Sequence, residues 1–554
     1  MEGSGSAEAI KNFRKPGRDA SSWMFYVMIL LVISLPLSEF GMSVAQFLLL
    51  GFWIFEGADY TKSESVSRVI FHNLKRKFLM VVINPVLLIF IAVYFFHALG
   101  LLYSTDLEYG LKDLRVKLPL LTFPVMIATS SPLNSKRMNV VLLFFALSVF
   151  TGSLISTVVY LTGNLGDPRE MSIFISHIRF SLFVAFSIYI LIGFVRFNSF
   201  MSRTYNIIFL GMALWLFIFL LILKSSTGLI ITVILFMTIV SLSALNNKSL
   251  MIPGTLIILL ILAGFWLYVR DIYKDLVIAE PITLSNHMER TSRGNLYQHD
   301  TINYGIENGR YVGSYLAIEE MRESWNKRSA IDYDGLDRKG QHLSYTLIRY
   351  LHSKGLNKDA DGVNKLSDKE ITQIENGVTS SSYLNELSPR SYFEQLLMGF
   401  LAYTKDNNPN ASSFMQRIEY WKTSIYLIKQ EPIAGYGTGD VKNAFERAYI
   451  DTHSNLLPEF RHRSHNQFFA ITVALGLIGL AVFMLALFYP PLRLWKFNNY
   501  YYLVFFLVAI LSFLTEDTLE TQPGATFFGF FSALFLFGIT READINAPVF
   551  ANND

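Results

Sequence analysis

The stretch FRHRSHNQFFAITVALGLIGL, residues 460–480, changes from polar to apolar within a few residues. Its first part is basic, and from Phe468 onward it is an apolar run of the kind that lies in lipid. Similar runs recur along the chain, in which 52% of the 554 residues are hydrophobic and only 16% are charged. This composition excludes an ordinary soluble protein and predicts an all-α, polytopic membrane protein.

Apolar runs of roughly 17 to 25 residues predict about twelve membrane spans. The predicted spans are residues 22–37, 41–56, 78–103, 117–130, 138–162, 173–195, 205–223, 226–244, 250–270, 467–490, 498–515 and 523–540. The first follows a polar, basic leader without a small-residue cleavage site, which is typical of a retained signal anchor. The chain has no cysteine, so disulfide and thiolate chemistry are excluded.

The basic residues of the short connections predict the orientation of the chain. With a cytoplasmic N-terminus, seventeen of them lie on the inner side and about five on the outer side, as the positive-inside rule requires. Apolar residues at helical spacing in 311–325 and 391–404 predict that the long polar segment folds as a mostly helical domain. The predicted organisation is a cytoplasmic segment 1–21, nine spans in 22–270, an extracytoplasmic loop domain 271–466, three spans in 467–540 and a cytoplasmic tail 541–554.

The few basic residues on the predicted outer side are informative because topology disfavours them. Arg179 lies inside the start of the sixth predicted span, where an ionised side chain is costly unless it meets a partner or a water-filled cavity. The other members of this predicted positive cluster are Lys112, Arg115, Lys117, Lys224, Arg417, Arg461, His462, Arg463 and His465. Guanidinium groups bind phosphate in a fork geometry, so the cluster suits a phosphate-containing ligand.

Each of these residues also has a simpler explanation. Arg115 and Lys117 fit the solvated face of an interfacial helix. Arg179 fits a carboxylate partner that serves packing alone. His462 and His465 are compatible in principle with zinc, but no third ligand has suitable spacing, so no metal is expected.

Two further motifs flank the last spans. TEDTLETQPG, residues 515–524, forms the turn between the last two predicted spans and contains Glu516, Asp517 and Glu520. A carboxylate there suits the orientation of a histidine or the removal of a proton from a hydroxyl, although a plain polar turn explains it equally well. GYGTGD, residues 435–440, lacks the P-loop ending and predicts a tight turn in which Asp440 caps the following helix, with anion binding as the alternative.

Residues 417–440, RIEYWKTSIYLIKQEPIAGYGTGD, followed by RSHNQFFAITVALGLIGL at 463–480, resemble the bacterial O-antigen ligase and polymerase superfamily. Members of that superfamily carry an Arg/Trp helix, a PxxGxGxG-like turn and a His-Asn pair that opens a span, in this order. TEDTLETQPGATFFGFFSALF, residues 515–535, resembles the closing segment of ligase-like members. The predicted topology fits over the whole chain, whereas the strong motifs lie in its last third.

The resemblance implies a membrane glycosyltransferase of the GT-C type in the bacterial inner membrane, with 271–466 as a periplasmic loop domain. Such an enzyme transfers a glycan from undecaprenyl diphosphate to a lipid A-core sugar hydroxyl at the periplasmic face, without metal, cofactor or nucleotide. Its partners are these two substrates and the lipid bilayer, and no nucleic acid is expected. The alternatives are an O-antigen repeat-unit polymerase, a protein O-oligosaccharyltransferase or, from another class, a lipid-linked glycan flippase.

The resemblance also implies roles for particular residues. His465 matches the histidine of the His-Asn pair, Arg417 matches the arginine of the loop helix, and Arg179 and Lys117 match the family's outer-face cations. Where many members have Ser-Arg-Gly after the seventh span, this chain has KSSTG at 224–228, and Lys224 offers a point charge in place of the fork of an arginine.

The two lines of reasoning together predict a site for an inverting glycosyl transfer. The predicted catalytic residues are His465, Arg179, Glu516 and Glu520. The predicted ligands of the substrate diphosphate are Arg179, Lys117, Lys224, Arg417, Arg115, Arg463 and His462. His465 is either the base that takes a proton from the acceptor hydroxyl or a cation that contacts phosphate.

Overall fold

A computed structural model describes residues 18–59, 65–163, 168–197, 202–246, 248–277, 290–307, 310–338, 340–381, 389–410 and 412–541. The chain divides into two compact units, one formed by residues 1–255 with 416–554 and the other by residues 256–415. Residues 416–466, which the sequence analysis assigns to the loop domain, therefore fold with the first unit. The predicted cytoplasmic segments 1–21 and 541–554 lie almost entirely outside the described residues.

The first unit consists of helices, most of them apolar. Its helices before residue 247 and after residue 466 are α2 (Arg18–Leu37), α3 (Glu39–Phe55), α4 (Val66–Val82), α5 (Pro85–Gly100), α6 (Leu107–Lys117), α7 (Pro119–Ala128), α8 (Ser135–Thr162), α9 (His177–Phe197), α10 (Arg203–Ile222), α11 (Ser226–Asn246), α20 (Gln467–Arg493), α21 (Tyr500–Thr515) and α22 (Gln522–Phe537). The polar helices α18 (Ser413–Gln430) and α19 (Val441–Asp451) precede α20. The short 3-10 helices are η1 (Leu101–Tyr103), η2 (Pro168–Met171), η5 (Pro458–Phe460), η6 (Lys496–Asn498) and η7 (Thr518–Glu520). Helix α12 (Lys248–Val277) starts in this unit and continues into the second.

Seven helical segments among the described residues are long and apolar enough to cross a membrane. They are Pro85–Tyr103, Ser135–Thr162, His177–Phe197, Arg203–Ile222, Ser226–Leu245, Met251–Asp275 and Gln467–Arg493, and four shorter apolar helices coincide with the predicted spans 22–37, 41–56, 498–515 and 523–540. The predicted fourth span differs, because α7 has only 10 residues, which is about 15 Å of helix and too short to cross a bilayer alone. The count of twelve spans stays a prediction.

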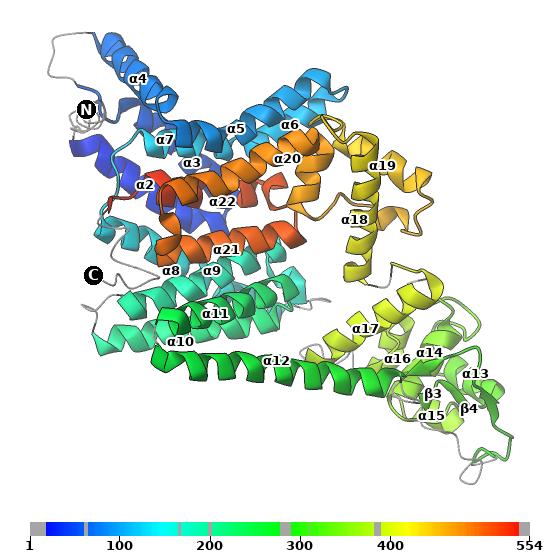
Figure 1. Cartoon of the computed structure of the whole chain (residues 1–554). Coiled ribbons are helices and arrows are strands. Elements are labelled where there is room, and N and C mark those ends of the chain that lie inside the picture. Colours follow the sequence, from blue (N-terminus) through cyan, green and yellow to red (C-terminus); the bar gives the residue numbers. More distant parts are fainter. Residues whose placement is uncertain are drawn as a thin grey trace. The chain divides into compact units, whose positions relative to one another are not determined.

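Helix α9 lies at the centre of the first unit. It packs against α8, α10, α11 and α21, and its most apolar stretch is 83% buried (Figure 1). Phenylalanine rings from these helices and from α22 interlock: the centroid of Phe186 lies 5.2 Å from Phe531 and 5.9 Å from Phe505. Aromatic rings at these separations stabilise a core beyond the area they bury. This core holds the start of α9 close to the turn between α21 and α22.

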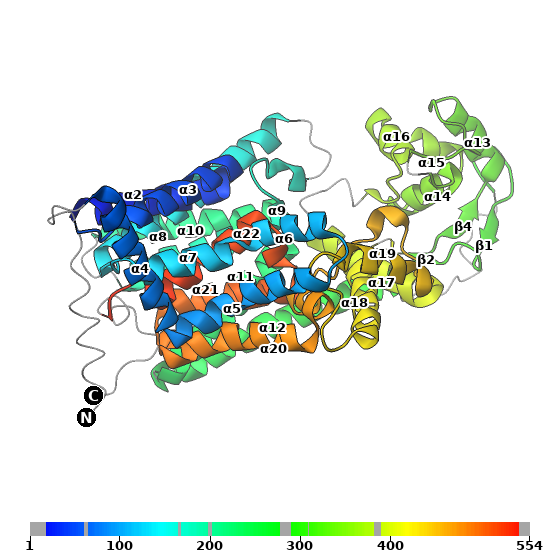
Figure 2. The same ribbon diagram turned by 90° about the horizontal axis from the view of Figure 1, so that it is seen from above.

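Helix α20 is interrupted at Gly476, whose φ of 65° and ψ of −167° are not helical. The segment 432–437, which contains the first two glycines of the GYGTGD motif, fills the break. Three backbone hydrogen bonds replace the missing helical ones, from the N–H groups of Tyr436, Gly437 and Leu477 to the carbonyls of Val473 (2.9 Å), Ala474 (2.8 Å) and Pro432 (2.8 Å), respectively. Helix α5 lies alongside α20 (Figure 2). The break is therefore part of the fold, and its backbone N–H and carbonyl groups remain hydrogen-bonded.

We expect Gly476→Ala to lower the melting temperature by several degrees. A Cβ atom at Gly476 would lie 2.0 Å from the carbonyl oxygen of Ile433, and its positive φ favours glycine. The matched control is Gly211→Ala in α10, where a Cβ atom meets nothing within 4 Å and helix propensity favours alanine. Thermal unfolding in detergent gives the melting temperature of each variant. Equal melting temperatures for the two variants would contradict the expectation.

The second unit is mostly helical, as expected for the loop domain. Its described helices after α12 are α13 (Ile318–Asn326), α14 (Leu343–Ser353), α15 (Ala360–Asn364), α16 (Asp368–Glu375) and α17 (Pro389–Asp406). Its strands are β1 (Gln298–Asp300), β2 (Ile306–Glu307), β3 (Arg310–Tyr311) and β4 (Gly313–Leu316), paired antiparallel as β1–β4 and β2–β3. Helix α17 covers the predicted helical segment 391–404, whereas 311–325 begins as strands and becomes helical only at Ile318. Trp325, Leu347 and Tyr350 belong to its own buried core.

Candidate functional site

Glu516, in the turn between α21 and α22, is the centre of an ion-pair cluster. Its side chain is fully buried. One carboxylate oxygen, Oε1, accepts from Arg417 of α18 at 2.5 Å. The other, Oε2, contacts Arg179 of α9 at 3.4 Å and Nδ1 of His465 at 3.1 Å. The cluster thus joins three predicted catalytic residues and the arginine of the loop helix.

His465 is fixed by its neighbours just before α20. Asn466 forms the N-cap of α20 by accepting the N–H of Phe469, and its amide donates to the carbonyl of Leu514 at 2.9 Å. The ring of His465 stacks on Tyr420 of α18, with centroids 5.3 Å apart, and its backbone has a φ of 43°. Such left-handed backbone in a residue other than glycine is uncommon and concentrates at functional sites.

The contact with Glu516 determines the tautomer of His465. An ionised carboxylate can only accept, so Nδ1 carries the proton and Nε2 of the neutral ring carries the lone pair. Burial would raise the pKa of Glu516, but the hydrogen bond from His465 and the charges of Arg417 and Arg179 outweigh it and hold that pKa below its ordinary value. The His465 side chain is 28% exposed, so a reactant can approach it.

Arg179 is almost fully engaged by the acidic turn. Besides Glu516, its guanidinium contacts the Asp517 carboxylate at 3.7 Å and the Asp517 carbonyl at 3.4 Å. Its Nε donates to Thr521 Oγ1 at 3.3 Å. Only 7% of the side chain is exposed, so this intramembrane charge has the partners that its position requires.

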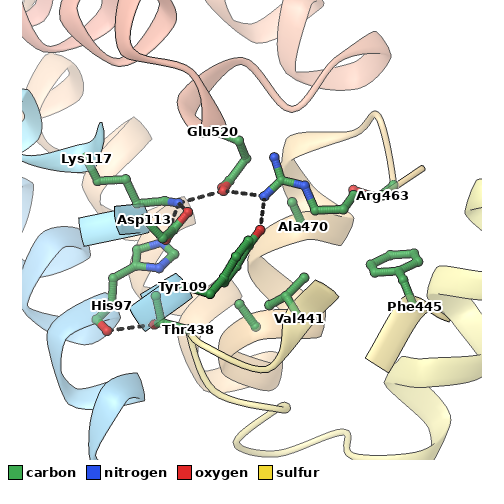
Figure 3. A pocket seen from close by; sticks show the side chains of 12 residues that line it. His97, Tyr109, Asp113, Lys117, Thr438, Val441, Phe445, Arg463, Ala470 and Glu520 are labelled. Atoms are coloured by element: carbon green, nitrogen blue, oxygen red, sulfur yellow. Dashed lines mark hydrogen bonds and ion pairs between the residues drawn. The ribbon is translucent and has the colours of Figure 1, made fainter. Parts of the chain in front are cut away.

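A second cluster surrounds Glu520 (Figure 3). The Lys117 ammonium lies 2.7 Å from Glu520 and within 2.7 Å of both Asp113 carboxylate oxygens. Arg463 also contacts Glu520, at 3.1 Å, and reaches Asp517 at 3.6 Å. Arg463 therefore connects the two clusters into one network.

The network pairs four basic side chains with four acidic ones. Its basic members are Lys117, Arg179, Arg417 and Arg463, and its acidic members are Asp113, Glu516, Asp517 and Glu520. The sequence analysis predicted a surplus of positive charge at this place. The acidic partners remove that surplus, because each of the four cations is paired.

The two carboxylates beside Lys117 have opposite pKa shifts. Burial and the negative charge of Glu520 raise the pKa of Asp113 to about 7. Burial also acts on Glu520, but the charges of Lys117 and Arg463 hold the pKa of Glu520 below its ordinary value. One acid of this pair is therefore ionised while the other binds a proton near neutral pH.

Asp113 gives a test of this electrostatic arrangement. Between its ordinary pKa of 3.8 and its folded pKa of about 7, the folded state binds the proton and the unfolded state does not. The contribution of Asp113 to stability thus falls as the pH rises through this window and is constant above it. We expect the melting temperature to decrease less from pH 5 to pH 8 in Asp113→Asn than in the wild type or in the exposed-site control Asp361→Asn. An equal change in melting temperature from pH 5 to pH 8 in all three proteins would contradict this expectation.

The remaining predicted ligands of a diphosphate lie in different surroundings. His462 is exposed, with its ring centroid 5.9 Å from that of His465. Arg115 is exposed in the last turn of α6, and Lys224 lies between α10 and α11 with a φ of 50°. Neither Arg115 nor Lys224 belongs to the ion-pair network described above. Lys117 is 1% exposed and surrounded by carboxylate oxygens, which does not fit the predicted direct contact with phosphate.

The side chains of His465, Glu516 and Asp517 also lie close enough to share a metal ion, with their ligand atoms within 4.8 Å of one another. Arg179, Arg417 and Arg463 contact the same two carboxylates. A divalent cation would thus meet like charge at short range. These residue types fit an ion-paired cluster better than a metal site.

Several residues of the site escape sequence reasoning. Asp113 and Lys117 are four residues apart on a helix, and this spacing indicates an ion pair. Two other residues give no such signal: Tyr109, whose hydroxyl accepts from Arg463 at 3.0 Å, and Gln467, whose amide donates to Glu520 at 3.3 Å. Asp440 is the N-cap residue of α19, as predicted, but its side chain makes no cap hydrogen bond there. Its carboxylate accepts the N–H groups of Thr105 and Asp106 before α6 instead.

The comparisons with known proteins agree with the motifs. Residues 374–484 match a protein-family model described as O-antigen ligase. No curated protein sequence matches the chain closely enough to count as a relative. The matched segment contains Arg417, the GYGTGD turn and the His465–Asn466 pair. The matched segment covers less than half of the chain, and it supports the resemblance to the O-antigen ligase-like superfamily that the sequence motifs indicated.

Proposed function

We propose that the protein is an O-antigen ligase. It transfers a glycan from undecaprenyl diphosphate to a sugar hydroxyl of lipid A-core at the periplasmic face of the inner membrane, without a metal ion and with inversion at the anomeric carbon. The observation that carries the proposal is the contact of Glu516 with both His465 and Arg417. One buried carboxylate thereby orients a candidate base and places a guanidinium beside it.

The proposed reaction is a single displacement. The acceptor oxygen forms a bond to the anomeric carbon while the bond between that carbon and the diphosphate oxygen breaks. The hydroxyl proton passes to Nε2 of His465, and Glu516 stabilises the imidazolium through Nδ1. The bonding electron pair leaves with the diphosphate, which is the second product together with the glycosylated acceptor.

The partly exposed cations near His465 are the best candidates for contact with the leaving diphosphate. The side chains of Arg417 and Arg463 are 20% and 28% exposed, and an arginine has five N–H donors, more than their ion pairs use. His462 lies beside His465 on the exposed side. We assign Arg417, Arg463 and His462 to the diphosphate. Arg179 and Lys117 act as positioning residues that hold Glu516, Asp517 and Glu520 in place.

Reconstitution tests the proposal. Full-length protein in detergent is mixed with undecaprenyl-diphosphate-linked glycan and lipid A-core that lacks O-antigen. A ligase yields glycan attached to lipid A-core. Lengthening of carrier-linked glycan would favour the polymerase instead, and transfer to protein the oligosaccharyltransferase. Movement of carrier-linked glycan across a vesicle bilayer without any transfer would refute the enzyme in favour of a transporter.

A further inference from the structure

Helix α4 has a buried face and an exposed face that is both apolar and basic. Its buried residues are Val69, Asn73 and Lys77, which are spaced by four residues. On the other side, Phe71 and Phe78 are 65% and 66% exposed. The helix contains no acidic residue. Such a face needs a partner that covers the apolar rings and balances the positive charge.

The buried face holds α4 against the end of α3. The Asn73 amide donates to the carbonyls of Ile54 at 2.9 Å and Glu56 at 3.0 Å. The Lys77 ammonium donates to the carbonyl of Trp53 at 2.5 Å and to the Glu56 carboxylate at 3.1 Å. Figure 1 shows α4 at an edge of the first unit. Because these bonds fix the buried face, the opposite face of the helix is directed away from the protein.

The exposed side of α4 carries two stripes. Phe71, Phe78 and Val82 are exposed and follow one another at spacings of seven and four residues, so they lie on one side of the helix. Arg68 and Lys75 are also exposed, and each precedes a phenylalanine by three positions. Residues three apart are neighbours on a helix surface. A basic stripe therefore borders an apolar stripe, which is typical of a helix that lies in a membrane interface.

The place of α4 in the chain puts its last turn at a membrane boundary. The predicted third span starts at Phe78, but α4 continues to Val82 and a separate helix, α5, begins at Pro85. The segment that is long and apolar enough to cross a membrane is Pro85–Tyr103. The positive-inside rule predicts that the start of this segment is cytoplasmic. We therefore expect α4 to lie at the cytoplasmic surface of the membrane, outside the third span.

An anionic phospholipid fits both stripes. An amphipathic helix at a membrane buries its apolar side at the boundary between head groups and acyl chains. Lysine and arginine beside that boundary attract anionic lipids. A zwitterionic head group carries its own cation, so it balances the charges of Arg68 and Lys75 less well. A second copy of α4 would bring two basic stripes together without any carboxylate, and like charges repel.

We propose that α4 is an interfacial helix that docks on anionic phospholipids of the cytoplasmic leaflet. Phe71, Phe78 and Val82 enter the outer part of the acyl layer, and Arg68 and Lys75 bind head-group phosphates. The inference goes beyond the proposed function and does not depend on it, because it concerns the predicted cytoplasmic side of the membrane.

The first test measures the depth of the apolar stripe. The chain has no cysteine, so a nitroxide spin label can be attached at one position in Phe71→Cys, in Phe78→Cys and in the control Asp361→Cys, which is at an exposed position. Each full-length variant is reconstituted into vesicles of phosphatidylglycerol and phosphatidylethanolamine. Oxygen dissolves among acyl chains and a nickel chelate stays in water, so the ratio of their collision rates with the label reports its depth.

We expect this ratio to be several-fold higher for labels at Phe71 and Phe78 than for the label at Asp361. Labels on α4 that are as accessible to nickel as the control label would overturn the inference. Labels that neither oxygen nor nickel reaches would also overturn it, because protein would then cover the stripe.

The second test concerns the charge of the lipid. The melting temperature of the full-length protein is measured in mixed micelles as phosphatidylglycerol replaces phosphatidylcholine, because a ligand that binds the folded state stabilises it. We expect a rise in wild type that shrinks at high salt. The double variant Arg68→Gln/Lys75→Gln should lose a clear part of this rise, and the control Lys365→Gln/Lys442→Gln, at two exposed positions, should keep it. An equal rise in both double variants would overturn the selection of anionic lipid.

Discussion

Replacement of His465 by alanine is expected to lower kcat for glycan transfer by about 10²- to 10⁴-fold, the usual contribution of a general base. The KM for the carrier-linked donor should change little, because Arg417 and Arg463 remain available to the diphosphate. Thermal stability should also change little, since the ring is partly exposed and its main contacts are Glu516 and the face of Tyr420. Single-turnover measurements with labelled donor give the rate of the chemical step.

Two more substitutions at this position separate a base from a cation. His465→Lys keeps a positive charge and His465→Gln keeps a hydrogen-bond donor, but neither offers a neutral imidazole nitrogen at Nε2. If His465 is the base, both variants remain as slow as the alanine variant. Substantial recovery of kcat in His465→Lys would show that the residue contacts phosphate as a cation. The exposed His72→Ala serves as the control for the loss of a histidine elsewhere.

Glu516→Gln is expected to impair both activity and folding. The glutamine has nearly the shape of the glutamate but no charge, so Arg179 and Arg417 lose their shared partner while Arg179 stays buried. Removal of one member of a buried ion pair typically costs about 3–5 kcal/mol. We expect a clear fall in the melting temperature and a decrease in kcat of at least about 10²-fold, since His465 loses the charged acceptor that stabilises its imidazolium.

Two controls make the Glu516 result specific. Glu459→Gln removes an exposed carboxylate and should leave both the melting temperature and kcat unchanged. Glu516→Asp keeps the charge on a shorter side chain, so it should recover stability more than activity. Wild-type kcat in folded Glu516→Gln would remove Glu516 from the mechanism. The pKa of Glu516 lies below its ordinary value of 4.5, so its contribution to stability is complete above that pH and is lost on further acidification.

Features encoded by local sequence were predictable. Apolar runs indicated the long helices, and the match of residues 374–484 supports the family resemblance that the motifs indicated. The sequence also indicated the His465–Asn466 junction at the start of α20. The predicted span 117–130 differs from the structure because an apolar run indicates hydrophobicity but does not fix the length of a helix. In the structure α6 ends at Lys117 and α7 is short.

Pairing across the chain was not predictable. Arg179 and Glu516 are 337 residues apart, and Lys117 and Glu520 are 403 apart. Counting cations by membrane side identified Arg179 and Lys117, but it says nothing about which carboxylates pack against them. Long-range packing determines these pairs, and the expected positive surface is instead an ion-paired network.

The segment 432–437 has a consequence for the architecture as a whole. The segment follows α18 and is hydrogen-bonded to the interrupted part of α20. It therefore connects α18 to the helix that begins just after His465. These hydrogen bonds lie entirely within the first unit. We therefore expect insertions or deletions within the 256–415 unit to leave the hydrogen bonds between segment 432–437 and α20 unchanged.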